Sequence, residues 1–376
     1  LGRRGPALFF LVVLPVARPA VAGGAALLAF EVLSDYGVVN YYGVQTLTRA
    51  IFQTWFGLYD IDSATRLGAW FMTGIVGVVV LERLLRRRRR YSEATGRTSP
   101  LKPVRLYGWK GGLAAAACFA VFAVTFLIPV AQLVQWAGWT YGTVAARANF
   151  WMLAGNTLKG ALIAAAIVMA VSVVVGNTVR MMNSGFGAAI GKLLTAGYTI
   201  PGPIIAIGVL SLFLLLDRAL AALVPGLAAA MPGLLKSGAP PALSLSLAML
   251  ITGYVVRFMA VGYSAVESGF DRIGMKYAEA SRTLGAGTVR TFFTVDLPLI
   301  RGSLFSGAAL VFVEIVKELP LTLLLRPFNF DTLATKAYQY AGDERIYAAA
   351  LPSLLIVCVG LVSVLIFHQL ARGERR

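Results

Sequence analysis

The sequence predicts an all-α polytopic membrane protein with about eight transmembrane helices. Its 376 residues are 58% hydrophobic and have a mean hydropathy of +0.75, well above the range of soluble globular proteins. Eight apolar stretches have the length of about 20 residues that a helix needs to cross a hydrocarbon core of roughly 30 Å. They are too long and unbroken for barrel strands, and lipid does not tolerate unpaired backbone groups, so helices are required.

The predicted spans form a group of two followed by a group of six. They lie at 17–36, 66–85, 111–134, 157–177, 191–216, 243–264, 303–325 and 347–370. The stretch RRRRRYSEATGRTSPLKPVR separates the two groups, and its charge, its prolines and its lack of apolar periodicity predict an exposed linker. We therefore expect three parts: 1–85 with two spans, a basic cytoplasmic linker at 86–110, and 111–376 with six spans.

The basic residues predict the orientation in the membrane. Of the 34 Lys and Arg residues, 23 fall in the two termini and the alternate connections on their side, 9 fall on the other side, and Arg257 and Lys317 lie within spans. The positive-inside rule places the richer side, with both termini and the run from Arg86 to Arg90, in the cytoplasm. The basic residues behind the net charge of +17 cluster between apolar stretches and are not interleaved with aromatic residues as in a nucleic-acid-binding surface. The lipid bilayer is therefore a predicted partner, and nucleic acid is not.

A charged segment rich in small residues, YAEASRTLGAGTVRTFFTVDLP at 277–298, separates the sixth and seventh spans. Glu279 falls in the first turn of a predicted short helix, where its charge suits the positive end of the helix dipole. The neighbouring small side chains keep one surface thin enough to enter a groove of another protein. Gly285 is expected to end the helix as a left-handed cap. The positions that define the pattern are Glu279, Ala280, Ser281, Gly285, Leu297 and Pro298.

An internal repeat relates this segment to the start of the chain. A shift of 283 residues places Leu1-Gly2 on Leu284-Gly285 and Leu14-Pro15 on Leu297-Pro298, and it gives 13 identities in 35 aligned positions without a gap. The register continues to Glu31, which falls on Glu314. It predicts two homologous halves in parallel orientation, of which the first is represented only from the glycine of its own loop onward. We expect its preceding spans to be missing from this chain.

The spacing E-A-[AS]-x3-G-x9-[IV]-x-L-P resembles the cytoplasmic EAA loop of ABC importer membrane subunits. The fused arrangement of two loops is similar to that of the bacterial iron(III) permeases, as are YTIPGPIIAIGVL and KELPLTLLLRPFNFDTLATKAYQYAGDERIYAAALP. Ser281 and Val295 depart from the usual Ala and Ile but conserve size. The resemblance implies an EAA-loop permease fold in a bacterial inner membrane, with both EAA loops and the C-terminus in the cytoplasm. The implied partners are two ABC ATPase subunits and a periplasmic binding protein that delivers iron(III).

The sequence contains no motif for the ATP hydrolysis that would drive transport. A phosphate loop requires G-x-x-x-x-G-K-[ST], and the nearest approach, at Gly191-Lys192, has Phe186 in place of the first Gly and Leu193 in place of Ser or Thr. The chain has one histidine and two cysteines, Cys118 and Cys358, and we expect both cysteines to be buried. With so few of these residues, we predict no metal site, no cofactor and no catalytic constellation. The chain is therefore predicted to be non-catalytic, with ATP hydrolysed by a separate subunit.

The resemblance implies that the loop residues transmit the movement of the ATPase subunits. Gly2, Leu14 and Pro15 would do so in the first copy, and the pattern residues of 277–298 in the second. Charged residues inside a membrane suggest a function by default. Six residues form the candidate translocation path: Glu31, Asp35, Glu314, Glu318, Pro201 and Pro203.

Several alternatives to this assignment remain open. Glu314 could simply form a helix-stabilising pair with Lys317 while the other acids lie at the outer interface. Pro201-Gly202-Pro203 can break the predicted span at 191–216, and this break could be a packing kink rather than part of the path. The cargo could be thiamine, a polyamine or an inorganic anion rather than iron(III). A secondary transporter driven by an ion gradient would favour inverted repeats, against the parallel register found here.

Overall fold

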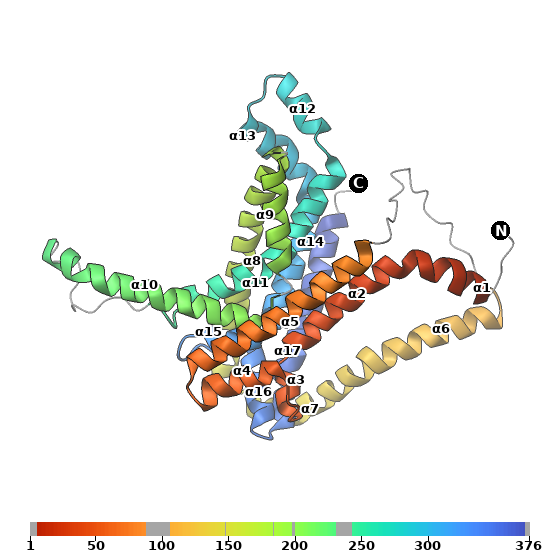
Figure 1. Ribbon diagram of the computed structural model, residues 1–376. Coiled ribbons are helices and arrows are strands. Elements are labelled where there is room, and N and C mark those ends of the chain that lie inside the picture. The colour runs from red at the N-terminus through yellow and green to blue at the C-terminus, as the bar shows by residue number, and fades with distance from the viewer. Residues whose placement is uncertain are drawn as a thin grey trace.

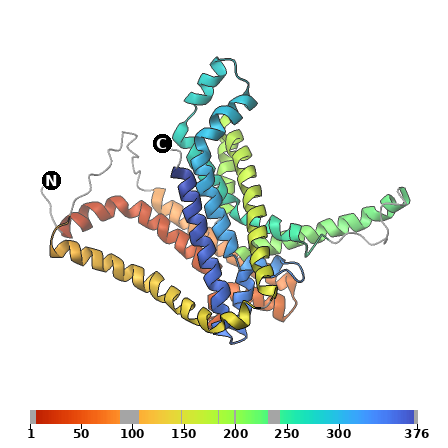
Figure 2. The same ribbon diagram turned by 180° about the vertical axis from the view of Figure 1, so that it is seen from behind.

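The computed structural model describes residues 6–87, 106–146, 148–182, 184–197, 200–230 and 243–372, and these ranges contain helices, turns and loops but no β-strand (Figure 1). Gly2 and most of the 86–110 linker lie outside the described residues. Helices α2 (Leu14–Ser34) and α6 (Trp109–Phe122) extend away from a central bundle on one side, and α10 (Gly202–Ala230) extends away from it on the other (Figures 1 and 2).

The elements follow one another with short connections. The first part has α1 (Pro6–Leu8), the π-helical turn η1 (Phe9–Val13), α2 (Leu14–Ser34), α3 (Gly37–Tyr41), α4 (Leu47–Phe52), η2 (Gln53–Gly57) and α5 (Ile61–Arg87). The second part has α6 (Trp109–Phe122), η3 (Ala123–Leu127), α7 (Ile128–Val144), α8 (Ala148–Met182), α9 (Gly185–Ala196), α10 (Gly202–Ala230), α11 (Leu247–Ile273), α12 (Lys276–Thr283), α13 (Thr288–Thr291), η5 (Phe292–Asp296), α14 (Leu297–Val316), α15 (Pro320–Leu325), α16 (Leu333–Gly342) and α17 (Ile346–Arg372).

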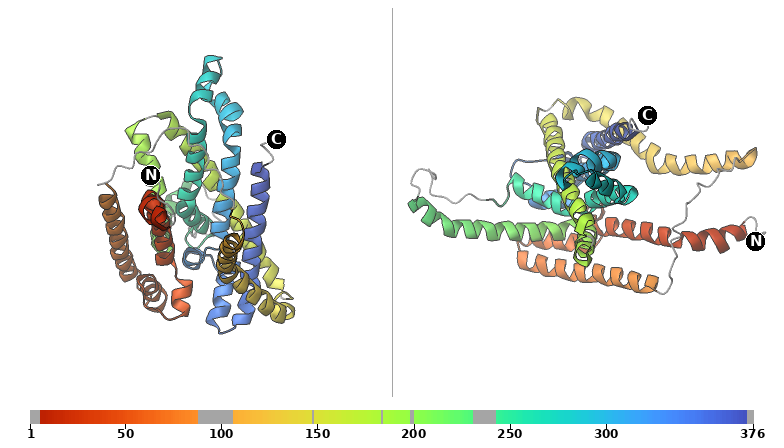
Figure 3. Two further views of the ribbon diagram at one scale, coloured as in Figure 1. Left: turned by 90° about the vertical axis from the view of Figure 1, so that its right-hand side faces the viewer. Right: turned by 90° about the horizontal axis from the view of Figure 1, so that it is seen from above.

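Helices α8, α11, α14 and α17 form the bundle, with α11 packed against both α8 and α14 (Figure 3). Glycines permit this close approach. A Cβ added at Gly262 of α11 would lie 2.6 Å from Val168 Cγ1 of α8, and one added at Gly307 of α14 would lie 2.6 Å from the Cβ of Ala265 of α11. Small residues at the contact are the usual means of bringing helices together in lipid.

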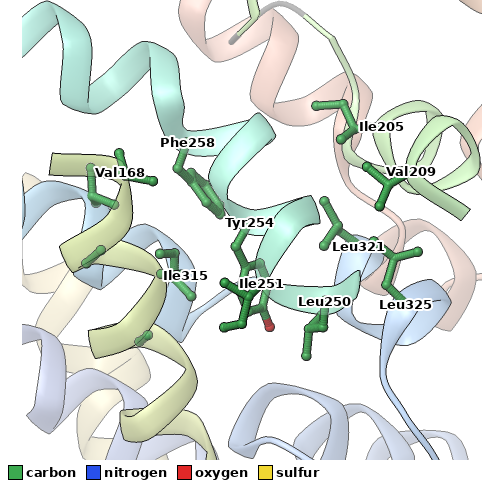
Figure 4. Close-up of a cluster of buried hydrophobic side chains, with 14 of the residues drawn as sticks. Val168, Ile205, Val209, Leu250, Ile251, Tyr254, Phe258, Ile315, Leu321 and Leu325 are labelled. Carbon is green, nitrogen blue, oxygen red and sulfur yellow. The ribbon is translucent and has the colours of Figure 1, made fainter. Parts of the chain in front are cut away.

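The largest buried cluster joins α8, α10, α11, α14 and α15 (Figure 4). Phe258, Leu250 and Leu321 are each no more than 1% exposed at its centre. Tyr254 is also buried, and its hydroxyl lies 2.7 Å from Thr322 Oγ1, so its polar atom is satisfied within the core. This core fixes the position of α15 and the residues just before it, which border the candidate site.

Six helices within the described ranges are long and apolar enough to cross a membrane. They are Trp109–Val144, Asn149–Met182, Gly202–Ala222, Leu247–Ile273, Thr288–Val316 and Ile346–Phe367. The pair Phe9–Arg18 and Val21–Ser34, bent by 60°, makes a seventh if it is one span. The predicted span at 66–85 lies within α5, which is not one of the six.

Two predicted spans are each divided between two helices, one of them at the break that its prolines predict. The stretch 191–216 is divided between α9 and α10, with Pro201-Gly202-Pro203 at the break, because proline lacks an N–H and restricts the residue before it. The stretch 303–325 ends as a helix at Val316, and Pro320 begins the separate α15. The apolar residues of α15 belong to the protein core rather than to one continuous span.

The structure repeats the element order that the 283-residue shift aligns. The shift carries η1 onto η5, the first residue of α2 onto the first residue of α14, and Gly37 at the start of α3 onto Pro320 at the start of α15. Farther along, α4 and α5 follow α3 in the first part, just as α16 and α17 follow α15 in the second part. Corresponding residues therefore occupy corresponding places in their helices.

The two cysteines correct another expectation from the sequence. Cys118 of α6 and Cys358 of α17 are both exposed rather than buried. In the candidate span Trp109–Val144, which contains α6, no residue of the most apolar 18-residue stretch is buried within the chain. An apolar side chain in a membrane protein can face lipid as readily as it faces the core, so hydropathy alone did not distinguish the two.

Candidate functional site

The segment predicted as a coupling loop projects from one end of the bundle as α12 and α13 (Figure 1). It connects the end of α11 with η5, which leads into α14. Glu279 lies in the first turn of α12, and Arg282 lies in the last. A hydrogen bond of 3.0 Å between Ser281 Oγ and Thr291 Oγ1 joins α12 to α13, so the projection is braced internally.

Gly285 ends α12 in the left-handed conformation that the sequence predicted, with φ at +86°. Its N–H donates to Arg282 O over 2.9 Å, and the N–H of Ala286 donates to Ser281 O over 3.1 Å. These two bonds form a Schellman motif, which satisfies carbonyl groups that the helix end would otherwise leave free. The cap turns the chain sharply and leaves the tip of the projection open to a partner.

The projection leaves its apolar residues uncovered within this chain. Leu284 at the turn is 88% exposed and Val289 is 71% exposed, whereas Ala278 at the base of α12 is buried. Glu279 and Ala280 are exposed, and Ser281 is partly buried by its contact with Thr291. The surface therefore combines a small side chain, a carboxylate and an apolar tip.

The Leu-Pro pairs of both copies occupy the same structural position. Leu14-Pro15 begins α2 and Leu297-Pro298 begins α14, each immediately after a π-helical turn. The preceding residues, Val13 and Asp296, are themselves helical, so each proline lies in a continuous helix next to a π-helical turn. Gly2 lies outside the described residues, so the loop glycine of the first copy has no structural account.

Lys317 joins the acidic residues that the two copies have in common. Its Nζ lies 3.2 Å from Glu31 Oε1 and 3.0 Å from Glu314 Oε1. The Glu314 contact is the helix-stabilising pair that the sequence left as an alternative, and the Glu31 contact connects α2 with the end of α14. One ammonium group therefore bridges two glutamates that occupy equivalent positions in the repeat.

Glu318 forms a second, more buried ion pair with Arg257 of α11. Arg257 Nε lies 3.2 Å from Glu318 Oε2, and the two side chains are 14% and 6% exposed. The other carboxylate oxygen, Oε1, accepts from the N–H of Leu321 over 3.0 Å, at the start of α15. Arg257 was noted in the sequence as a charge within a span, but its partner was not predicted.

The Pro-Gly-Pro break lies directly beside this pair. A Cβ added at Gly202 would lie 2.3 Å from Arg257 Nη1 and 3.3 Å from Glu318 Oε1. Pro201 and Pro203 are both buried. The break therefore allows α10 to begin in contact with the charged pair, a position that only a residue without a side chain can occupy without displacing Arg257.

A cavity of about 560 Å³ lies among these residues, between the end of α2, α3, the end of α14, α16 and α17. Its charged lining consists of Glu31, Asp35, Glu318, Arg257 and Lys317. Glu314 reaches it through Lys317. Asp35 Oδ1 accepts from the N–H of Val38 over 3.3 Å, so it also caps α3.

Three of the six candidate path residues thus line one cavity. Glu314 contacts Lys317 of its lining, and Pro201 and Pro203 flank Gly202, which lies beside Arg257. In the described part of the chain, no group of three or more His, Cys, Asp or Glu side chains is arranged to hold a metal ion. The carboxylates are instead spaced around the cavity with two basic groups between them.

The sequence did not predict the hydrogen bonds that Tyr338, which lines the cavity, makes with the residues around α3. The Tyr338 hydroxyl donates to the Tyr36 hydroxyl over 3.2 Å and accepts from Asn40 Nδ2 over 2.7 Å. These contacts join residues about 300 positions apart and tie α3 to α16. The repeat gave no signal for these contacts, since it aligns Tyr36 with Leu319 and Tyr338 with Trp55.

The helical fold, its exposed projection and the charged cavity define a polytopic membrane protein of the permease type. The chain belongs to the family of binding-protein-dependent transport system inner membrane components, whose pattern matches residues 182–376. It has the fold of an ABC importer permease. A bacterial ABC transporter that imports the polysaccharide alginate superposes with a TM-score of 0.56 at 15% identity, over 71% of this chain and 96% of that one.

Curated relatives extend the similarity over the rest of the chain. The Fe(3+)-transport system permease protein FbpB 2 of Haemophilus influenzae is 25% identical over 382 residues, which cover 99% of this chain and 69% of the relative. The molybdenum transport system permease protein ModB of Escherichia coli is 31% identical over 117 residues, which cover 30% of this chain and 50% of ModB. The prediction of an ABC importer permease is confirmed.

Proposed function

We propose that this chain is the permease subunit of an ATP-driven importer that moves iron(III) from a periplasmic binding protein into the bacterial cytoplasm. It is non-catalytic, and two separate ABC ATPase subunits supply the energy. The observation that carries the proposal is the exposed α12 projection, whose apolar tip at Leu284 is 88% exposed on the chain alone.

The α12 projection is the docking point for one ATPase subunit. A short helix with a small side chain at Ala280 and an apolar residue at its tip can enter a groove that a bulkier helix could not. Glu279 adds a charge at the exposed first turn. The loop of the first copy, represented by Gly2, Leu14 and Pro15, docks on the second ATPase subunit.

The end of the bundle that carries α12 faces the cytoplasm. The C-terminal end of α17 lies toward the same end (Figures 1 and 2). The count of basic residues, 23 against 9, supports this orientation because basic residues are retained on the cytoplasmic side. The proposal that both loops and the C-terminus are cytoplasmic follows from it.

Helix α14 connects the docking point to the cavity. It begins at Leu297, after the projection, and ends at Val316, just before Lys317 and Glu318. Its 20 residues have a length of about 30 Å, comparable with the thickness of the hydrocarbon core. A displacement of the projection by ATP binding would therefore reach the cavity as a rigid-body movement of α14.

The cavity is the candidate path for the cargo. It has more acidic than basic groups, and oxygen ligands suit a hard cation such as iron(III). The name of the Haemophilus influenzae relative, which is similar over 99% of this chain, supports the same cargo. The ModB relative and the basic groups at Lys317 and Arg257 give an inorganic anion as the second candidate.

The division into 1–85, 86–110 and 111–376 remains part of this proposal. Its support is the repeated order of η1, α2 and α3 in η5, α14 and α15. Two homologous halves would contribute one docking loop each, and the cavity would lie where α2 and α14 approach each other through Lys317.

Uptake into vesicles that contain the whole complex tests the cargo. Asp35→Asn keeps an oxygen that can accept from the N–H of Val38 but removes the charge, and Glu314→Gln removes the charge of the acid that contacts Lys317. We expect each to lower the uptake of radiolabelled iron(III) by about tenfold through loss of electrostatic attraction. Asp62→Asn, an exposed acid in the first turn of α5, serves as the matched control. Iron uptake unchanged by both variants, together with molybdate uptake lost on Lys317→Gln, would replace iron(III) with an anion.

A further inference from the structure

A buried ion pair between Arg180 and Asp296 lies at the base of the α12 projection. Arg180 Nη1 is 3.0 Å from Asp296 Oδ1, and the two side chains are 11% and 5% exposed. Arg180 belongs to the last turn of α8, whereas Asp296 is the last residue of the π-helical turn that leads into α14. The pair therefore ties a helix outside the projection to the point where the projection ends.

The same guanidinium also holds the point where the projection begins. Arg180 Nη2 donates to the carbonyl oxygen of Gly274, the residue at which the chain leaves α11. Gly274 has φ at +61°, so the chain turns there in a conformation that favours glycine. The guanidinium carbon lies 4.9 Å from the centre of the Phe270 ring, which adds a cation–π contact with the last turns of α11.

Arg180 thus makes a clamp with three contacts, to Phe270, Gly274 and Asp296. The projection between the clamped points is internally braced by the hydrogen bond between Ser281 and Thr291. A braced projection held at both ends cannot tilt without either moving α8 or breaking the contacts of Arg180. Planar guanidinium donors suit this task because they reach two acceptors at fixed angles, which a lysine ammonium does not do.

We propose that Arg180 is the positioning residue that transmits movement of the α12 projection to α8 and α14 during transport. The inference rests on the proposed coupling of this projection to an ATPase subunit. It goes further in assigning the transmission to a residue outside the projection. Asp296 falls on Val13 in the 283-residue register, so the first copy has no acid at the equivalent position. The clamp is therefore assigned to the second copy alone.

The test uses the whole transporter complex with Arg180→Gln, Asp296→Asn and the double variant. Three quantities are measured: the ATPase subunit that co-purifies, the ATP hydrolysed per assembled complex, and the iron(III) imported per ATP. Arg272→Gln is the matched control, since Arg272 is an exposed arginine in the last turn of α11.

We expect the ATPase subunit to co-purify and ATP hydrolysis to persist in both single variants, while iron imported per ATP falls by about tenfold. The double variant should be no worse than Arg180→Gln alone, because that single variant already removes the ion pair with Asp296. Arg272→Gln should match the unaltered complex in all three measurements.

A purely structural role predicts a different pattern, with less assembled complex but an unchanged ratio of import to ATP, and that result would overturn the proposal. Effects of the single variants that multiply in the double variant would also contradict it. Should Arg180→Gln fail to assemble, Asp296→Asn decides the question, because it retains the Arg180 contacts to Gly274 and Phe270. Absence of any ATPase subunit from the unaltered complex would instead contradict the proposed function.

Discussion

Lys317 and Glu31 are 286 positions apart in the chain, yet Lys317 Nζ lies 3.2 Å from Glu31 Oε1. The same ammonium contacts Glu314, which the internal repeat aligns with Glu31. Both Lys317 and Glu31 are about half exposed, at 45% and 48%. The contact thus lies at the mouth of the cavity rather than in the core, and its role concerns charge more than stability.

The first prediction concerns that pair. A double-mutant cycle with Lys317→Ala and Glu31→Ala should give a coupling free energy of about 0.2 to 1 kcal/mol in thermal unfolding, because water screens half-exposed charges. The measurement is the unfolding of detergent-solubilised protein followed by tryptophan fluorescence. A coupling of several kcal/mol would mean that the pair holds α2 to the bundle, contrary to the exposure of its side chains.

The second prediction concerns the buried pair of Arg257 and Glu318. Glu318→Gln retains an oxygen for the N–H of Leu321 but leaves the buried guanidinium without its counter-charge. We expect the free energy of unfolding to fall by about 3 kcal/mol. Asp271→Asn, an exposed acid at the end of α11, is the control and should have little effect. Equal stability of the two variants would show that water reaches Arg257 freely.

The third prediction tests the close approach of α8 and α11. Gly262→Ala would place a Cβ 2.6 Å from Val168 Cγ1 and 2.9 Å from Ser172 Oγ, and it should cost about 1 to 3 kcal/mol through overpacking. Gly208→Ala in α10 is the control, because a Cβ there meets nothing within 4 Å. A normal unfolding temperature for Gly262→Ala would mean that the helices can separate at little cost.

The fourth prediction concerns the cap of α12. Gly285→Ala forces an alanine to adopt φ at +86° and should destabilise the cap by about 1 kcal/mol. The helix would fray at the tip, and less ATPase subunit should co-purify. Gly287→Ala is the control, since Gly287 has φ at −66° and an added Cβ would meet nothing within 4 Å. Equal recovery of the ATPase subunit with both variants would show that the cap of α12 does not contribute to docking.

The sequence predicted the elements whose signal is local or repeated. Gly285 as a cap, the break at Pro201-Gly202-Pro203 and the correspondence of Glu31 with Glu314 could all be read from residue type and register. The break also shows the limit of hydropathy, because the apolar stretch 191–216 continued through two separate helices. The hydropathy of a residue predicted that it lies in an apolar environment, but it did not tell whether that environment is lipid or the protein core, as the exposed Cys118 demonstrates.

The side-chain pairs of the site could not be predicted in the same way. Arg257 was visible as a charge inside an apolar span, which signals a functional or paired residue. Its partner Glu318 lies 61 positions later, and the choice among several acids depends on how α10, α11 and α15 pack. Arg180 and Asp296 each looked like ordinary charges near the ends of helices, and the fold alone brings them together.

The most direct test of the account is whether the α12 projection binds an ATPase subunit. In the complex purified from cells, Glu279→Ala combined with Leu284→Arg should abolish co-purification of the ATPase subunit while the permease itself remains folded. Glu344→Ala, an exposed acid in the turn between α16 and α17, should leave co-purification unchanged. Full retention of the ATPase subunit by the Glu279 and Leu284 double variant would contradict the assignment of this projection as the coupling loop.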